Sequence, residues 1–349
     1  MIRIDIQKNS SSKISSIDFN NLGFGEFFTD HLFQANYEHD DWITPVIKPI
    51  DKIAIHPGNS TLHYGQAIFE GLKAYRKANN DIQLFRPEKN IDRFNKSATR
   101  LCMPQVPKDL FLSAIKSLVD LERKWVPERK YGSLYIRPFM FANEAFLGVR
   151  PAEKYTMIII LSPVGSYYNK PLNVKVERDF TRAVRGGIGS AKAAANYAAS
   201  LYPMQQAKKQ GYDQLIWTDG QNHNNVEELG TANFFAVIDN KLCTPKASDS
   251  ILEGVTRDSI IQLARHLGIE VDDNGVSVTQ MEEAYRTGSL TECFSTGTAA
   301  VISSIVSIDF DNFKAEFNTN FPIAGLLKNT LMDIQFGSNK DIFNWTVKV

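Results

Sequence analysis

The most informative stretch of this chain is Gly186-Gly-Ile-Gly-Ser-Ala-Lys192-Ala-Ala-Ala-Asn-Tyr197, which surrounds one lysine with glycine and alanine. Small residues allow a ligand to approach the backbone closely. A lysine among apolar neighbours is a candidate for a nucleophilic amine. A lysine that faces solvent from an alanine-rich helix would show the same pattern. The residues alone therefore leave both interpretations of Lys192 open.

Three further stretches combine small, hydroxylated or acidic residues beside a predicted helix or strand. Leu252-Glu-Gly254-Val-Thr-Arg-Asp258 leads into a helix predicted over residues 256–268, whose first backbone N–H groups favour an anion. Cys293-Phe-Ser-Thr-Gly297-Thr298-Ala-Ala300 is a hydroxyl-rich turn, and Glu227-Glu228-Leu-Gly-Thr-Ala-Asn233 places two carboxylates before a predicted strand. Helix capping by Thr256, a plain polar turn and solvated carboxylates explain these patterns equally well.

The composition argues against several classes of protein. Thirty-nine basic residues balance thirty-nine acidic ones, so the basic surplus of a nucleic-acid binder is missing. The longest mainly apolar run, Tyr155 to Val164, is about half of a bilayer span. Residues 1–21 mix charges and serines, unlike a signal peptide, and the three cysteines are too widely separated for a disulfide framework or zinc knuckle. We therefore expect a cytoplasmic protein without a nucleic-acid, membrane or metal partner.

Length and periodicity predict a two-domain α/β protein. At about 150 residues per domain, 349 residues indicate two domains. Alternation of polar and apolar residues predicts strands at Asp51–His56 and Phe69–Tyr75, and a helical period begins at Pro87. Two prolines bracket a polar stretch at residues 163–171, which is typical of a linker. The expected organisation is a first domain over residues 1–162, an interdomain loop over 163–176 and a second domain over 177–349.

In this order, the four patterns resemble the branched-chain amino acid aminotransferases, which are fold-type IV pyridoxal-phosphate enzymes. Further matching stretches are Phe24–His31, His63–Tyr75, Leu84–Arg93, Tyr135–Pro138, Asn143–Glu144 and Leu147–Val149. The resemblance implies a smaller N-terminal α/β domain and a larger C-terminal domain with a barrel-like β core. The larger domain would bind pyridoxal 5'-phosphate.

The resemblance also implies an activity and an assembly. The enzyme would move an amino group between leucine, isoleucine or valine and 2-oxoglutarate, which becomes glutamate. The pyridoxal and pyridoxamine forms of the cofactor would alternate in a ping-pong mechanism, and a homodimer would share its active sites. Two alternatives remain: an enzyme of the same fold that acts on D-amino acids or aminodeoxychorismate, and a non-catalytic regulator that binds pyridoxal phosphate. Tyr135-Ile-Arg137 and the Phe24 stretch favour the branched-chain enzyme.

Seven residues match the family's cofactor site. The resemblance implies that Lys192 carries the cofactor as a Schiff base and moves the proton between the substrate Cα and the cofactor C4′. Glu228 would face the pyridine nitrogen, and Tyr197 would hydrogen-bond the phenolic oxygen. The phosphate would be bound by Arg93, by the backbone at Val255 and Thr256, and by Thr298.

Eight residues match the family's substrate pocket. Arg137 would bind the γ-carboxylate of glutamate at the edge of an apolar wall, and Tyr64 would be a second polar position. Backbone groups at Thr231 and Ala299 would bind the α-carboxylate. The wall itself would be formed by Phe24, Phe69, Tyr135 and Val149. Tyr167 or Tyr168 would contact substrate from a mobile loop, and Ala194-Ala195 replaces the family's usual glycine pair.

Overall fold

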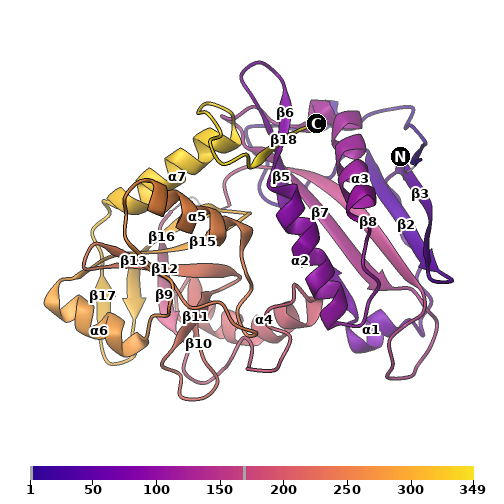
Figure 1. Ribbon diagram of the computed structural model, residues 1–349. Helices are drawn as coiled ribbons and strands as arrows, with labels where there is room; N and C mark the ends of the chain where they lie inside the picture. The colour runs from indigo at the N-terminus through magenta and orange to yellow at the C-terminus, as the bar shows by residue number, and fades with distance from the viewer. Residues whose placement is uncertain (1–2, 168–169) are drawn as a thin grey trace. The chain divides into compact units, whose positions relative to one another are not determined.

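Packing divides the chain into two compact units. The computed structural model describes residues 3–167 and 170–349. Unit 1 contains the described residues up to Tyr167 together with Ala191–Ala195 and Asp333–Val349, and unit 2 contains the other described residues up to Met332. Both units contain helices and strands (Figure 1), so the predicted α/β class is confirmed.

Unit 1 is the larger of the two by these ranges, whereas the resemblance implies a smaller N-terminal domain. The difference arises because the C-terminal residues return to unit 1. Strand β18 (Thr346–Lys348) pairs with β6 (Ile82–Phe85), and Arg86 N donates to the carbonyl oxygen of Trp345 over 2.7 Å. Nothing in the periodicity of the last residues predicts this pairing. The domain boundaries at residues 162 and 177 stay a prediction.

Unit 1 is built on one nine-stranded sheet with the order β1-β3-β2-β8-β7-β5-β6-β18, and β4 pairs with β7. Only the pairing of β1 with β3 is parallel among the described pairs. The remaining strands are β1 (Asp5–Ile6), β2 (His31–Glu38), β3 (Asp41–Pro49), β4 (Ala67–Phe69), β5 (Leu72–Arg76), β7 (Ser133–Ala142) and β8 (Tyr155–Val164).

Two helices supply the apolar cover of this sheet, as Figure 1 shows. Helix α2 (Pro87–Arg100) begins with proline in its first turn, where the missing N–H costs nothing, and it buries the predicted stripe that includes Ile91, Phe94 and Ala98. Helix α3 (Lys108–Leu121) buries a second stripe. The short elements of this unit are α1 (Ser60–Tyr64), η1 (Ile14–Ser16) and η2 (Arg123–Trp125).

Two strand predictions in unit 1 need correction. Residues 51–56 form no strand: all six are exposed, so their alternation of polar and apolar residues has no sheet face to bury. The strand predicted over Phe69–Tyr75 is interrupted at Glu70-Gly71, between β4 and β5. Pairing with β7 stops after Phe69 and resumes at Leu72. A propensity pattern does not reveal this break, because its cause is a side chain from another strand, described below.

Unit 2 contains a closed barrel. Its sheet has the order β11-β10-β9-β16-β15-β12, and a further pairing of β11 with β12 closes the ring. The barrel-like β core implied by the resemblance is thus confirmed. The barrel strands are β9 (Leu172–Val176), β10 (Gln214–Thr218), β11 (Val226–Leu229), β12 (Ala232–Ile238), β15 (Leu290–Gly297) and β16 (Val301–Asp309).

Short strands and helices complete the chain. Helices α5 (Val255–His266) and α6 (Val278–Thr287) pack on β15. The carboxylate of Glu292 accepts 2.9 Å bonds from the first turn of α7. No helix in the described part of the chain is long and apolar enough to span a membrane. The other elements are α4 (Ala194–Lys209), α7 (Pro322–Gln335), β13 (Lys241–Cys243), β14 (Val271–Asp272) and β17 (Lys314–Glu316).

We expect Gly132→Ala to destabilise the protein more than a matched glycine replacement. Gly132 has a φ of +142°, and a Cβ there would lie 1.9 Å from the carbonyl oxygen of Val164, a backbone atom that cannot step aside. Gly211 has a φ of +91° with no atom close to such a Cβ, so Gly211→Ala measures the backbone cost alone. Urea denaturation should show losses of about 2–4 kcal/mol against about 1 kcal/mol. Equal losses would contradict the packing described here.

Candidate active site

Unit 1 fixes Lys192 by its backbone on both sides. Its amide N donates to Ser97 Oγ over 2.9 Å, and its carbonyl oxygen accepts from Phe69 N over 3.0 Å. Ala193 forms a bridge with Ile68 in β4. Helix α2 and strand β4 therefore hold the base of this side chain from two directions.

The side chain of Lys192 lies beside an aromatic ring. Its Nζ is 4.8 Å from the centroid of the Phe69 ring, within the range of cation–π contact. Lys192 precedes helix α4, so the interpretation of a lysine on an alanine-rich helix is wrong. Ala194 and Ala195 are exposed in the first turn of that helix.

Arg93 forms an ion pair that the sequence did not predict. Its Nε donates to Glu70 Oε1 over 2.6 Å, and its Nη2 donates to Glu70 Oε2 over 2.9 Å. The side chain of Glu70 is completely buried, and Asn90 Nδ2 also donates to its Oε2, over 2.8 Å. The predicted phosphate ligand is therefore held side-on by a carboxylate.

The surroundings of Glu70 keep its carboxyl group ionised. Burial raises the pKa, but the charge and hydrogen bonds of Arg93, the charge of Lys192 and the bond from Asn90 outweigh it. The pKa of Glu70 therefore lies below its ordinary value. The motif His63–Tyr75 contained this residue, but periodicity gave no reason to single it out.

An aromatic cluster adjoins these charged groups in unit 1. The rings of Phe24 and Tyr135 meet edge to face with centroids 5.1 Å apart, and Phe24 meets Tyr167 at 4.8 Å. Gly71 provides the room for Tyr135, since a Cβ at residue 71 would lie 2.0 Å from the tyrosine hydroxyl. This close approach explains the break between β4 and β5. The second loop tyrosine, Tyr168, lies outside the described residues.

Arg137 joins this cluster to the ring beside the lysine. Its guanidinium lies 4.6 Å from the Phe69 ring centroid and 5.2 Å from that of Tyr135, and its Nη2 donates to the Tyr135 hydroxyl over 3.0 Å. Its Nε is buried without a hydrogen-bond partner among the described atoms. An unpartnered buried N–H of a cation is costly, so the site is suited to an incoming anion.

Tyr64 and Val149 lie elsewhere on unit 1. They are 45% and 89% exposed, and both line a separate hollow of about 320 Å³ with Arg100 and Arg150. The structure brings neither of them to the Phe24–Tyr135 cluster.

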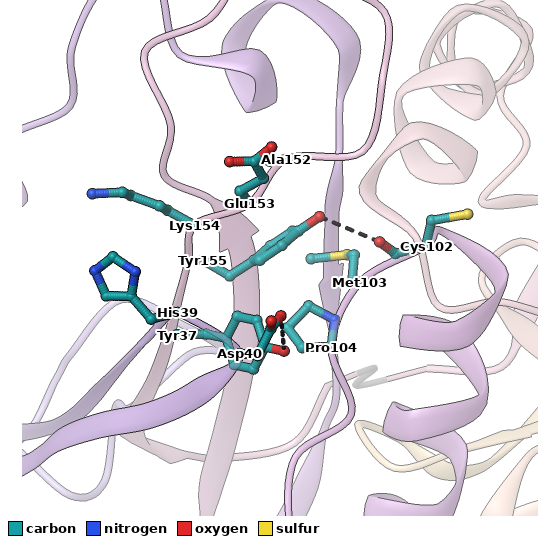
Figure 2. A pocket seen from close by; sticks show the side chains of 10 residues that line it. All are labelled: Tyr37, His39, Asp40, Cys102, Met103, Pro104, Ala152, Glu153, Lys154 and Tyr155. Carbon is teal, nitrogen blue, oxygen red and sulfur yellow. Dashed lines mark hydrogen bonds between the residues drawn. The ribbon is translucent and has the colours of Figure 1, made fainter.

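A larger hollow of unit 1 contains none of the predicted site residues. Figure 2 shows this hollow of about 580 Å³, whose lining includes Tyr37, Met103 and Tyr155. Among residues 3–167 and 170–349, no group of His, Cys, Asp or Glu side chains could hold a metal ion.

In unit 2, both adjacent carboxylates of β11 are buried, contrary to the interpretation of solvated loop residues. Glu228 Oε1 accepts from Leu252 N over 2.7 Å, and its Oε2 lies 3.4 Å from Arg182 Nε. Glu227 accepts from the hydroxyl of Ser250. Arg182, which the sequence did not single out, also donates to the carbonyl oxygen of Ser250 and so links the two acids.

The segment before α5 is clamped by β11 and β12. Besides the Glu228 bond, Asn233 Nδ2 donates to the carbonyl oxygen of Leu252 over 2.8 Å. Gly254 is required there, because a Cβ would lie 2.0 Å from Asn233 Oδ1. Gly254 is the N-cap of α5 and provides no side-chain cap, and Thr256 in the first turn is buried. The fixed helix N-terminus at Val255–Thr256 is suited to an anion.

Two turns lie at one end of the neighbouring strands β12 and β15. Thr231 precedes β12, and Thr298 and Ala299 follow β15, whose Thr296 pairs with Asn233. Val301, a β-branched residue, has a φ of +62°, a strained conformation that ends the second turn. The predicted backbone groups at Thr231 and Ala299 therefore lie on adjacent strand ends within unit 2.

Tyr197 lies in the first turn of α4. It is half-buried, and its carbonyl oxygen accepts a 2.8 Å bond from Ser200 Oγ. Asn196 beside it donates to the carbonyl oxygen of Ile188 over 2.8 Å. These bonds fix the direction in which the helix leaves the glycine-rich stretch.

We expect Glu227→Gln to remove a pH dependence of stability. Burial, and next to it the charge of Glu228, raises the pKa of Glu227 from 4.5 to about 7, although Ser250 and Arg182 oppose the shift. The folded state holds this proton more tightly, so the stabilisation is complete below pH 4.5 and is lost as the pH rises through about 7. Urea denaturation should show the variant gaining on the wild type across this window, by on the order of 1–3 kcal/mol.

The exposed Glu283→Gln variant controls for the change in net charge. A difference between Glu227→Gln and wild type that stays constant across the window would refute the assignment.

Comparison with known proteins covers nearly the whole chain. The amino-transferase class IV family matches residues 67–308. A "Probable branched-chain-amino-acid aminotransferase" of Staphylococcus epidermidis is 46% identical over 99% of this chain and 98% of its own length. The solved Escherichia coli branched-chain amino acid aminotransferase has a TM-score of 0.74 at 27% identity, covering 91% of this chain and 98% of its own.

A second solved structure is a bacterial branched-chain amino acid aminotransferase complexed with N-(5'-phosphopyridoxyl)-L-glutamate. It has a TM-score of 0.72 at 26% identity, and the match covers 90% of this chain and 97% of that one. Fold, motif order and family match agree, so the predicted family is confirmed. The chain belongs to the class IV aminotransferases.

Proposed function

We propose that this chain, a branched-chain-amino-acid aminotransferase with pyridoxal phosphate as its cofactor, moves the amino group of leucine, isoleucine or valine to 2-oxoglutarate. The names of the relatives and the phosphopyridoxyl adduct in a structural neighbour support the class of substrate and the cofactor. The observation that carries the proposal is the arrangement around Phe69. Its ring contacts both the amine of Lys192 and the guanidinium of Arg137.

The donor set of the chain fits a phosphorylated pyridine. The α5 N-terminus has no side-chain cap, and the clamp by Asn233 and Glu228 fixes it in place. Arg93 supplies a guanidinium for the same phosphate, and Thr298 a hydroxyl. A dianion met by a guanidinium and a helix N-terminus is bound strongly.

Three side chains would act on the cofactor ring and on the reacting proton. When bound, pyridoxal phosphate takes up the amino group and withdraws electrons from the substrate Cα. Lys192, fixed by its backbone, binds the cofactor covalently and moves the proton to and from the substrate Cα. Glu228, held by Leu252 N, keeps the ring nitrogen protonated. Tyr197 donates to the phenolic oxygen.

The substrate residues resolve a chemical conflict. The pocket must accept branched apolar side chains and also the γ-carboxylate of glutamate. Phe24, Phe69 and Tyr135 form an aromatic wall, and the buried Nε of Arg137 supplies a donor at its edge. An apolar substrate would contact the rings, while the carboxylate of 2-oxoglutarate would pair with the guanidinium. The backbone at Thr231 and Ala299 would bind the α-carboxylate.

A homodimer is part of the proposal. Exposed apolar side chains gather on unit 1, where a bridge between Asn59 and Ala145 joins two segments. They include Ile55, Leu62, Phe146, Leu147 and Val149. Exposed apolar groups of this kind favour contact with another chain. Tyr64 and Val149 would then reach substrate in the partner's site, which accounts for their exposure. A cytoplasmic location stays a prediction.

The alternative activities differ in their substrates. An enzyme for D-amino acids would accept D-alanine, and a lyase would release product from aminodeoxychorismate without an amino acceptor. A non-catalytic regulator would turn over neither substrate pair. The direction of flow is left open, because transamination is close to reversible.

The experiment that tests the function is an initial-rate study with leucine and 2-oxoglutarate, each varied at several fixed concentrations of the other. Two half-reactions that share one site predict parallel double-reciprocal lines. Converging lines would contradict the mechanism. Turnover of D-alanine in place of leucine would contradict the proposed substrate class.

We expect Arg137→Leu to separate the two substrate classes. The variant loses the donor for the γ-carboxylate but keeps an apolar side chain beside Phe69 and Tyr135. Single-turnover rates with glutamate should fall about 100-fold or more, whereas those with leucine should change several-fold at most. Arg129→Leu, which removes a surface ion pair with Asp333, is the control. Equal losses for glutamate and leucine would show that Arg137 does not discriminate.

A further inference from the structure

Glu70 has no role in the mechanism above, although it is completely buried. Both of its oxygens are engaged by Arg93, at 2.6 and 2.9 Å. Asn90 Nδ2 and Gly71 N add bonds of 2.8 and 3.0 Å to Oε2. The backbone N of Glu70 donates to the carbonyl oxygen of Pro138 over 2.7 Å. The carboxylate is therefore fixed in position and in orientation.

We propose that Glu70 is a positioning residue, which holds the guanidinium of Arg93 in the orientation that binds the cofactor phosphate. The inference rests on the proposed function, which assigns Arg93 to that phosphate. A guanidinium presents five N–H donors in a planar fork. Glu70 engages Nε and Nη2, one edge of the fork, and thereby sets the direction in which the rest of the fork points.

The two ends of this ion pair lie on the elements that hold Lys192. Glu70 follows Phe69, whose N donates to the carbonyl oxygen of Lys192. Arg93 lies one turn before Ser97, whose hydroxyl accepts from Lys192 N and donates to the carbonyl oxygen of Arg93 over 3.0 Å. The pair therefore joins β4 to α2 at the level of the lysine. It fixes Arg93 relative to the residue that binds the other end of the cofactor.

Stability alone does not account for such a pair. Replacing a buried ion pair by apolar groups is often neutral or stabilising, because taking both charges out of water is costly. Orientation does account for it. A flexible arginine that is held before the ligand arrives loses less side-chain entropy on binding.

The test compares two probes on the full-length apoprotein: pyridoxal phosphate and pyridoxal, which lacks the phosphate. Glu70→Asp keeps the charge but shortens the side chain by one methylene, so both bonds to Arg93 survive only if Arg93 moves. We expect the affinity for pyridoxal phosphate to fall about tenfold or more, with that for pyridoxal unchanged within about twofold. Equal losses for both probes, or none for either, would overturn the inference and leave Glu70 a purely structural role.

Two control variants separate this inference from the proposed function. Arg93→Gln should lose the same preference for the phosphorylated probe; if it does not, the phosphate role of Arg93 fails and the inference fails with it. If Arg93→Gln loses the preference and Glu70→Asp keeps it, only the inference fails. Glu122→Asp alters another buried carboxylate of unit 1, which pairs with His31, and should lower thermal stability without changing the preference.

A milder variant guards against misfolding of Glu70→Asp. Asn90→Ala removes one bond to Glu70 Oε2 and leaves both members of the ion pair in place. We expect a smaller loss in the same direction, confined to pyridoxal phosphate. An unchanged preference in folded Asn90→Ala would count against the positioning role.

Discussion

The ion pair between Glu70 and Arg93 is the constraint on which the lysine side of the site depends. A carboxylate without access to water must be paired, and here a bidentate guanidinium and two further donors satisfy it. Because the partners lie on β4 and α2, the pair fixes the distance between the elements that hold Lys192 by its N–H and its carbonyl oxygen. The strand break at Gly71 belongs to the same arrangement, since it admits Tyr135 beside the pair. Charge pairing thus organises packing, and packing positions the reactive amine.

Unit 2 uses buried polar groups for a related purpose. Glu228 and Asn233 reach from neighbouring barrel strands and hold the backbone on both sides of Leu252. The N-terminus of α5 follows at once, so a rigid sheet sets the position of an anion-binding helix end. One carboxylate thereby serves the structure through Oε1 and lies beside Arg182 through Oε2. In both units a fully enclosed acid fixes backbone or cationic groups before any ligand is bound, which reduces the entropy lost on binding.

Sequence reasoning succeeded where a pattern reflects local structure or a long motif. The helices from Pro87 and Thr256 followed from their apolar periodicity, and the family followed from the order of its motifs. It failed at Asp51–His56, because alternation does not tell whether a sheet is present, and at Glu70-Gly71, because the break is imposed by Tyr135 from another strand. Glu70, Arg182 and the C-terminal strand were missed for the same reason. Their partners are distant in sequence, and neither periodicity nor propensity carries that information.

The central claim, that Lys192 is the residue that binds the cofactor covalently, is tested most directly by borohydride reduction and peptide mapping. The protein with bound pyridoxal phosphate should show a visible absorbance band that reduction removes, and the label should be found on the peptide that contains Lys192. Two results would contradict the account. One is a label on another lysine, such as the buried Lys73 of β5; the other is the absence of any band after pyridoxal phosphate is added.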